Sequence, residues 1–285
     1  MTSKREKPTE PEIDDDAVKR YFEGTGGSQA AAAMSMMTHE HNLPSAAVDY
    51  WLSKEIATIQ SWLEAVGYSG RVLDVGCGAG AWVEIFANRF QSVVGVERSG
   101  PMVAAAQERI AHLQNARVYQ GDGREDLPDG PFDLIFLGGL MMYLKDSDVL
   151  EMLHSLKERL SEAGTIVLRE STVRKGMFTP TGEYQVIYRS ISAYEKLFLE
   201  AGIADVQVRG NSGYTSMVIA EEMVDLRRKL LPFLPKQSLK LGALTWAVLR
   251  GTSPISFRAL PWTLSLLRIP WPKLQNHFFR LSSRT

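Results

Sequence analysis

The stretch RVLDVGCGAGA, residues 71–81, contains the pattern that decides the fold. An apolar, β-rich run leads directly into glycines at positions 76, 78 and 80, and an amphipathic segment begins near Trp82. Glycine permits a tight turn and lets the backbone approach a ligand that a Cβ atom would repel. The amide groups at the start of the following helix then face that ligand. The stretch therefore predicts a strand, a nucleotide-binding loop and a helix.

Outward from this loop, short apolar runs alternate with helical patterns. The strands that we expect are 71–75, 93–97, 118–120, 132–137, 165–169, 206–209 and 214–219, and the helices are 82–90, 102–113, 149–160 and 191–201. This alternation predicts an α/β fold with a doubly wound, mostly parallel seven-stranded sheet. Only Gly210–Gly213 separates the last two runs, so we expect an edge hairpin whose second member is an antiparallel last strand.

Two acidic residues narrow the class of ligand. Asp74 lies inside the first strand, where a buried carboxylate would repel a pyrophosphate but attract an ammonium group. Glu97 ends the second strand 21 residues after Gly76, a spacing that suits a carboxylate binding both hydroxyls of a ribose. A dinucleotide loop would place glycine at Ala81, although alanine is tolerated there. The residues favour a nucleoside that carries an ammonium group.

These motifs resemble those of class I S-adenosylmethionine-dependent methyltransferases. VLDVGCGAG at 72–80 is similar to the first motif of that family, and Gly121-Asp122-Gly123 is similar to the segment whose Asp meets the adenine amino group. The resemblance covers residues 46–220 and implies a Rossmann-like fold with S-adenosyl-L-methionine as cofactor. The cofactor-binding residues that it implies are Asp74, Gly76, Cys77, Gly78, Gly80, Glu97, Arg98, Met102, Asp122, Gly123 and Gly138. For Cys77 and Met102, simple packing in the core remains an open alternative.

The acceptor of the methyl group is expected at the carboxyl ends of the strands. Candidate catalytic bases are Glu170, which ends a strand at this edge, and His39 and His41 of the N-terminal segment, although the two histidines are also typical of solvated helix ends. Alternate positions on a helix diverge, so we expect no metal at His39 and His41. Tyr143, which follows the fourth strand, is a candidate substrate-binding residue. The long 173–190 connection adds Arg174, Tyr184, Tyr188 and Arg189, which could instead pack this connection down.

Charge divides the chain sharply. Residues 1–225 carry a net charge of −12, whereas residues 226–285 contain eleven basic residues and no acidic one. We expect a disordered N-terminus at 1–16, a helical lid at 17–66, a Rossmann-like methyltransferase domain at 67–222 and a basic, Trp/Pro-rich helical extension at 223–285. Basic residues interleaved with Trp and Phe favour an anionic membrane surface as partner. Fold-back onto the core or a dimer contact is the second interpretation. Nucleic acid is the third, and the strongly apolar character of the extension argues against it.

The composition excludes several other classes of protein. An apolar content of 45% in 285 residues excludes a disordered chain, and no run approaches the ~18 apolar residues of a membrane span. One cysteine and an N-terminus without an apolar signal region predict a cytoplasmic location, or a peripheral one on the inner face of a membrane.

The leading hypothesis for function is methyl transfer to an oxygen of a lipid-linked, glycolipid or other amphipathic acceptor. A second hypothesis is O- or N-methylation of a small soluble metabolite, with the extension as a structural cover or dimer element. A third is a nucleotide-binding module without catalysis.

Overall fold

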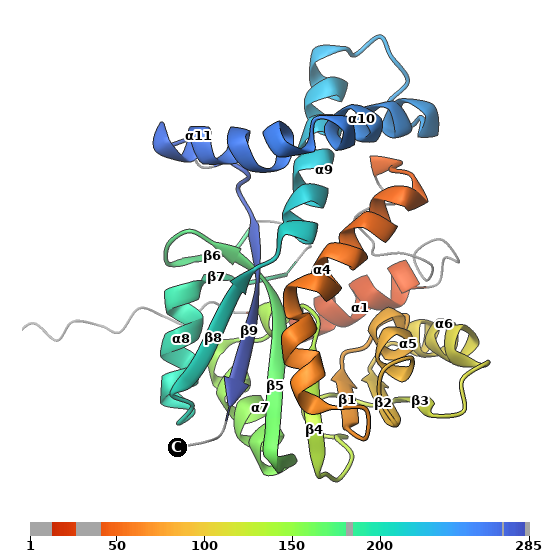
Figure 1. The fold of residues 1–285 in the computed structure, drawn as a ribbon, viewed down its shortest axis with the longest axis vertical. Helices are drawn as coiled ribbons and strands as arrows, with labels where there is room; N and C mark the ends of the chain where they lie inside the picture. The colour runs from red at the N-terminus through yellow and green to blue at the C-terminus, as the bar shows by residue number, and fades with distance from the viewer. Residues whose placement is uncertain (1–12, 27–40, 181–184, 270, 283–285) are drawn as a thin grey trace, which may run out of the picture.

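A mixed sheet with helices on both faces forms the body of the protein (Figure 1). The computed structural model describes residues 13–26, 41–180, 185–269 and 271–282. The parallel strands are β1 (Arg71–Val75), β2 (Ser92–Glu97), β3 (Ala116–Gln120), β4 (Phe132–Leu137) and β5 (Leu160–Val173). They lie in the order β3-β2-β1-β4-β5, which confirms the predicted doubly wound arrangement. Strand order reverses between β1 and β4, where such folds bind ligands.

Two apolar layers bury the faces of the sheet. On one face, α4 (Ser45–Val66), α5 (Ala81–Ala87) and α6 (Gly100–Ile110) pack through residues such as Trp62 and Phe86. On the other, α7 (Asp146–Glu158) and α8 (Ile191–Glu200) pack through residues such as Leu153 and Phe198. Buried on both sides, the central strands read as continuous apolar runs rather than alternating ones. Helices α5, α6, α7 and α8 each begin within four residues of their predicted starts, and α4 lies within the helical segment expected at 17–66 and ends with it at Val66.

The predicted last strand at 214–219 is wrong. These residues belong to α9 (Ser212–Leu230), which begins where the Asn211 side chain accepts a hydrogen bond from the Tyr214 N–H at 3.0 Å. Met217, Ala220 and Val224 recur at helical spacing and are buried in one cluster with Trp51 of α4. A short apolar run fits a buried strand or a buried helix equally well, and here the Asn211 cap and packing on α4 favour the helix.

The antiparallel strand comes instead from the end of the chain. β9 (Gln275–Ser282) lies between β5 and β8 (Asp205–Gly210) and pairs antiparallel with both. Phe278, Phe279 and Leu281 of β9 are fully buried, so this strand joins the two apolar layers. The seven long strands therefore lie in the order β3-β2-β1-β4-β5-β9-β8, and the predicted antiparallel member is present but has a different sequence.

Residues 211–274 form an insertion between β8 and β9. After α9 it contains α10 (Leu239–Gly251), a π-helical turn η2 (Ile255–Ala259) and α11 (Leu260–Leu266), as the expected helical extension (Figure 1). The domain boundary expected at residue 222 does not coincide with the end of the sheet, because β9 lies beyond it. A chain cut at residue 225 would therefore lose a central strand.

Smaller elements surround the carboxyl ends of the strands. The N-terminal helix α1 (Asp15–Gly26) begins within the segment expected to be disordered, whose first twelve residues lie outside the description. A 3₁₀ turn, η1 (Met141–Tyr143), follows β4. In the 173–190 connection, β6 (Met177–Phe178) pairs with β7 (Tyr188–Ser190), which continues the sheet beside the end of β5.

Candidate active site

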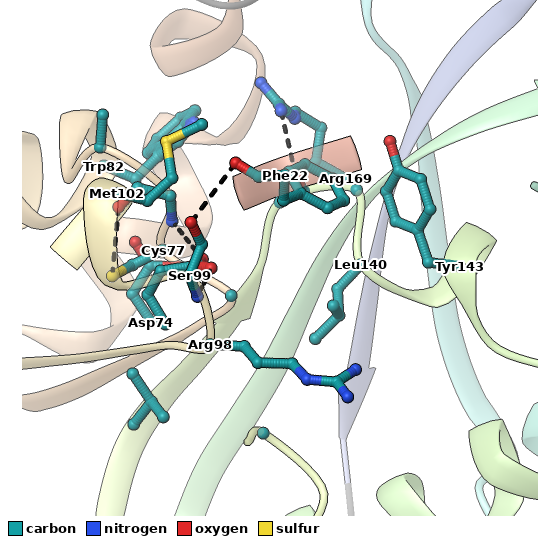
Figure 2. A pocket seen from close by; sticks show the side chains of 18 of the residues that line it. Phe22, Asp74, Cys77, Trp82, Arg98, Ser99, Met102, Leu140, Tyr143 and Arg169 are labelled. Atoms are coloured by element: carbon teal, nitrogen blue, oxygen red, sulfur yellow. Dashed lines mark hydrogen bonds between the residues drawn. The ribbon is translucent and has the colours of Figure 1, made fainter. Parts of the chain in front are cut away.

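A cavity of about 380 Å³ lies at the carboxyl ends of β1, β2, β4 and β5. The β1–α5 loop forms one side of it, and η1 and the end of β5 form the opposite side (Figure 2). Helix α1 lines it as well, through Val18 and Phe22 among others. All of the predicted cofactor-binding residues except Gly80 line this cavity. The carboxyl ends of parallel strands meet at one edge, which explains why the motifs converge.

The three glycines of the β1–α5 loop each have positive φ, between 54° and 77°. A Cβ atom on Gly78 would meet nothing within 4 Å, so the backbone there is open for a ligand to approach. Gly80 does not line the cavity: a Cβ atom there would lie 3.0 Å from the Cβ of Ala106 on α6. This third glycine therefore allows the close packing of α5 against α6.

Glu97 fixes the shape of this loop from the end of β2. Its carboxylate accepts hydrogen bonds from the Gly78 N–H at 2.9 Å and from the Ser99 N–H at 2.8 Å. Burial raises the pKa of Glu97, and these backbone donors act in the opposite direction. A carboxylate has about four acceptor positions, so two remain for hydroxyl groups of a ligand.

Asp74 has a different environment. It is 1% exposed and lines the cavity, and its Oδ2 atom has no hydrogen-bond partner among the described residues. Burial raises the pKa of Asp74 to about 8; the Arg169 guanidinium lowers it in part and the Glu97 carboxylate raises it further. Because a buried acceptor without a donor is costly, this oxygen is suited to an ammonium group entering the cavity.

Asp122 is held by arginines. Arg124 donates through Nε and Nη2 to both carboxylate oxygens, at 3.2 and 3.1 Å, and Arg98 lies 3.6 Å from Oδ2. Burial acts to raise the pKa of Asp122, but the hydrogen bonds and charge of Arg124 outweigh it and the pKa is lowered. Asp122 is thus ionised and anchored, and Gly123 beside it also lines the cavity.

Helix α1 covers the cavity through contacts at both of its ends. Near the start, Asp15 pairs with Arg124 at 2.9 Å. Further along, the carbonyl of Phe22 accepts from the Ser99 hydroxyl at 3.4 Å, and the Phe22 ring meets that of Tyr143 at a centroid distance of 5.0 Å. Figure 2 shows the backbone of Phe22 close to Ser99, with Tyr143 on the far side of the cavity from Cys77 and Met102. The helix therefore bridges the glycine-loop side and the η1 side.

Met102 and Cys77 line the glycine-loop side of the cavity. Burial raises the pKa of the Cys77 thiol, so it is a packed thiol rather than an activated nucleophile. The Trp82 indole packs on the Phe136 ring with a centroid distance of 4.7 Å. Its buried N–H has no hydrogen-bond partner among the described residues.

The opposite side of the cavity contains a polar network that the sequence did not predict. Arg169 of β5 pairs with the fully buried Glu55 of α4 at 3.1 Å and donates to the Gly138 carbonyl at 3.1 Å. Ser171, two residues further on, donates to the Tyr214 hydroxyl at 3.1 Å. Trp51, Leu52 and Leu140 line the cavity alongside these groups. An arginine inside the apolar run 165–169 was the one available sign of the network; Tyr214 had no such sign.

Glu170 does not face the cavity, and its prediction as a catalytic base is corrected. Successive strand residues point to opposite faces, so Arg169 and Ser171 line the cavity while Glu170 points away. Its carboxylate accepts from the Met141 N–H at 3.1 Å and from the Tyr194 hydroxyl at 3.2 Å. Burial raises its pKa to about 7. Glu170 therefore positions η1 through the Met141 backbone.

The other predicted acceptor-side residues separate into three groups. Tyr143 lines the cavity, as expected. His41, Arg174, Tyr188 and Arg189 do not: His41 contacts Asp225 of α9, Arg174 bonds to the insertion, Tyr188 stacks on Phe178, and Arg189 pairs with Asp146. These residues carry the charges and rings typical of binding sites, but here they join structural elements. His39 and Tyr184 lie outside the described residues.

The cavity residues fit S-adenosylmethionine. Asp74 would bind the ammonium group of its amino-acid part, Glu97 the ribose hydroxyls, and the Gly78 region would accept the close approach of the nucleoside. The anchored Asp122 retains acceptor positions toward the adenine amino group.

Comparisons with known proteins agree with this geometry. Residues 72–164 match the family model of a methyltransferase domain. Phosphoethanolamine N-methyltransferase 1 of Caenorhabditis elegans is 32% identical over 101 residues, 35% of this chain and 21% of that protein. Phosphoethanolamine N-methyltransferase of Triticum aestivum is 26% identical over 207 residues, 71% of this chain and 39% of that protein. The chain thus spans less than half the length of these curated relatives.

Two solved structures show the same fold. A SAM-dependent methyltransferase of Leishmania major has a TM-score of 0.57 at 19% identity, covering 69% of this chain and 75% of its own. The second is phosphoethanolamine N-methyltransferase 2 of Haemonchus contortus, in complex with phosphomonomethylethanolamine and S-adenosylhomocysteine. It has a TM-score of 0.56 at 17% identity, and the match covers 82% of this chain and 53% of that protein. The match over 72–164 identifies a methyltransferase domain, and the fold around it is that of these S-adenosylmethionine-dependent methyltransferases.

Proposed function

We propose that the protein transfers a methyl group from S-adenosylmethionine to an oxygen of an amphipathic acceptor, such as a lipid-linked sugar or a glycolipid. The carrying observation is the division of the cavity into two ends. Asp74 and Glu97 form an acidic end at the glycine loop. At the opposite end, the side chains of Trp51, Leu140 and Tyr143 line the cavity beside the polar network around Arg169. Apolar walls with a few polar groups favour an acceptor that has both a hydrophobic and a polar part.

When bound, S-adenosylmethionine supplies an electrophilic methyl group; the protein's part is placement and proton removal. Asp74 and Glu97 would fix the cofactor, and α1 would close over it through the Asp15–Arg124 ion pair. Arg169 lines the cavity and is held in place by Glu55 and the Gly138 carbonyl, so it would orient polar groups of the acceptor. In-line placement supplies most of the rate for such a transfer.

The proton of the acceptor oxygen has to pass to a group that reaches the cavity. Burial raises the pKa of Tyr214 beyond the usual tyrosine value, so its hydroxyl is a hydrogen-bond partner rather than a base. Asp15 and Glu23 of α1 are the most exposed of the carboxylates that line the cavity, and they could accept a proton through water.

A small soluble metabolite, methylated at oxygen or nitrogen, is the second candidate. The curated relatives that are named phosphoethanolamine N-methyltransferases favour it. The guanidinium of Arg169 already pairs with the carboxylate of Glu55, so its positive charge is largely neutralised. This pairing argues against a phosphorylated acceptor at this end of the cavity.

The test is a radiolabel assay with S-adenosylmethionine carrying a tritiated methyl group. Purified protein would be incubated with an organic-phase lipid extract and, separately, with a panel of soluble alcohols and amines. We expect label in the organic phase, absent in the Asp74→Asn variant. Label only in soluble products would favour the second candidate. No label in either, with cofactor binding intact, would contradict methyl transfer.

A further inference from the structure

The insertion emerges at the same edge of the sheet as the cavity. In the antiparallel pairing of β9, Gln275 lies beside Thr172 near the carboxyl end of β5, and His277 lies beside Gly210 at the end of β8. Both ends of the insertion therefore start from the cavity edge. Figure 1 shows α10 and α11 lying across this end of the molecule, beyond the sheet and joined to it by α9. Arg174, which follows β5, donates to the Ser265 hydroxyl at 3.3 Å and ties α11 to this edge.

Large apolar side chains are exposed mainly in this insertion. Of the 17 exposed large apolar residues in the described part of the chain, 13 lie between residues 226 and 269. They are Leu226, Leu230, Leu231, Phe233, Leu239, Leu244, Val248, Ile255, Leu260, Trp262, Leu266, Leu267 and Ile269. We call this set the insertion face. Two further exposed residues, Met177 and Phe178, lie in β6 at the same edge of the sheet. Such a concentration marks an interaction surface.

The helices of the insertion are apolar on the side that does not pack. In α10, Trp246 and Leu249 are buried in the cluster with α9 and α4, while Leu244 and Val248, one turn apart, are exposed. In α11 no residue is buried, although Trp262 and Leu266 are 66% and 63% exposed. A helix facing water would carry polar residues at these positions. The insertion is thus fixed to the core on one side and leaves an apolar side open.

Charge distinguishes among the partners that could cover this face. Residues 226–273 contain nine lysines and arginines and no acidic residue. Within the described part of the chain, Arg228 is the one among them with a carboxylate within 4.0 Å, that of Asp225. Two copies of the chain meeting through this face would bring two cationic surfaces together. Nucleic acid would satisfy the charges but leave the leucines in water. An anionic bilayer satisfies both, because cations meet headgroups and apolar side chains enter the acyl boundary.

We propose that the insertion face docks on an anionic lipid surface with α10 and α11 lying in the plane of the interface. None of the described helices combines the length and apolar character needed to cross a bilayer. Docking turns the carboxyl edge of the sheet, and with it the cavity, toward the lipid. This proposal stands on the insertion alone and does not depend on methyl transfer.

The experiment is flotation of the full chain with vesicles of phosphatidylcholine alone or with 30% phosphatidylglycerol, at low and high salt. We expect binding to the anionic vesicles, weakened by salt. Leu266→Asp should reduce the partition coefficient about tenfold or more, because it puts an anion into the apolar contact. Leu199→Asp is the matched control: Leu199 is 68% exposed on α8, outside the face, and its variant should bind as the wild type does.

Two further measurements separate the outcomes. Arg258→Glu with Arg268→Glu should weaken binding about tenfold, whereas Arg117→Glu on the exposed part of β3 should not. Brominated lipids should quench wild-type fluorescence more than that of Trp262→Phe, since Trp262 is the most exposed of the described tryptophans. Equal recovery with and without anionic lipid would overturn the proposal. So would a stable dimer in lipid-free solution that Leu266→Asp dissociates, or RNA binding that competes with vesicles at equal charge.

Discussion

Asp74→Asn is expected to raise the stability of the ligand-free protein while weakening cofactor binding. The carboxyl group is 1% exposed, its Oδ2 atom has no described partner, and its pKa is about 8 because burial disfavours the charge. Asparagine has nearly the same shape but cannot ionise. The substitution therefore separates the cost of the buried charge in the empty protein from its benefit to a bound ammonium group.

The stability effect follows from linkage. At pH values between 3.8, the ordinary pKa of aspartate, and about 8, its pKa in the folded protein, the folded protein holds a proton at Asp74 that the unfolded chain has lost. The free energy of unfolding therefore falls as pH rises through this window. At pH 7 the free energy of unfolding is lowered by at most about 4 kcal/mol, because each pH unit above 3.8 contributes ~1.4 kcal/mol and pH 7 lies about three units higher. Asp74→Asn removes this effect, so the variant should gain stability at pH 7 and differ little from the wild type near pH 4.

The binding effect has the opposite sign. An ammonium group favours ionised Asp74, so binding near pH 6.5 should release about one proton and affinity should rise with pH toward 8. Losing a hydrogen bond between charged groups costs roughly 1.5–3 kcal/mol, which corresponds to about 10–150-fold weaker binding near pH 8. In the variant the proton release should disappear.

The assay pairs urea unfolding between pH 4 and 8 with calorimetric titration of S-adenosylhomocysteine in two buffers of different ionisation enthalpy. Asp133→Asn is the matched control: Asp133 lies in the neighbouring strand β4 and accepts from the Arg71 N–H and the Ser161 hydroxyl outside the cavity. That variant should lose stability and keep its affinity. Unchanged affinity and proton release in Asp74→Asn would refute the reasoning.

Four further predictions concern the loop, the core and the corrected residue. Glu97→Gln should weaken S-adenosylhomocysteine binding about tenfold in calorimetry, since the Gly78 N–H loses its charged acceptor. Gly80→Ala should lower the free energy of unfolding by about 1–3 kcal/mol in urea, because φ is 77° and the new Cβ would meet Ala106 at 3.0 Å. Phe279→Ala should cost about 3–5 kcal/mol in the same experiment, as this fully buried side chain joins β9 to the core. Glu170→Gln should keep kcat within about threefold and leave the pH–rate profile unchanged; a loss of ~100-fold would restore Glu170 as the base.

The cofactor half of the site could be predicted because its chemistry depends on local sequence. Loop glycines with positive φ, a carboxylate inside a strand and another at a strand end leave a signature at fixed spacing, and Asp74, Gly78 and Glu97 all line the cavity. The alternation of strands and helices likewise follows from local periodicity.

The acceptor half and the last strand could not be predicted because they depend on distant segments. Whether Glu170 or its neighbour Arg169 faces the cavity depends on the register of β5. A shift of one residue in this register would turn Glu170 toward the cavity and Arg169 away from it. Tyr214 reaches the cavity only because α9 is capped by Asn211 and packs on α4. β9 belongs to the basic end of the chain, where no strand was expected. Its place between β5 and β8 depends on pairing with β5, from which it is separated by more than a hundred residues in sequence.

Binding of S-adenosylmethionine in the cavity at the carboxyl ends of the strands, through Asp74 and Glu97, can be checked by a crystal structure with S-adenosylhomocysteine. We expect the ligand's ammonium group within hydrogen-bond distance of Asp74 Oδ2, and its ribose hydroxyls at the Glu97 carboxylate. A ligand bound elsewhere, or one whose ammonium group lies away from Asp74, would contradict this expectation.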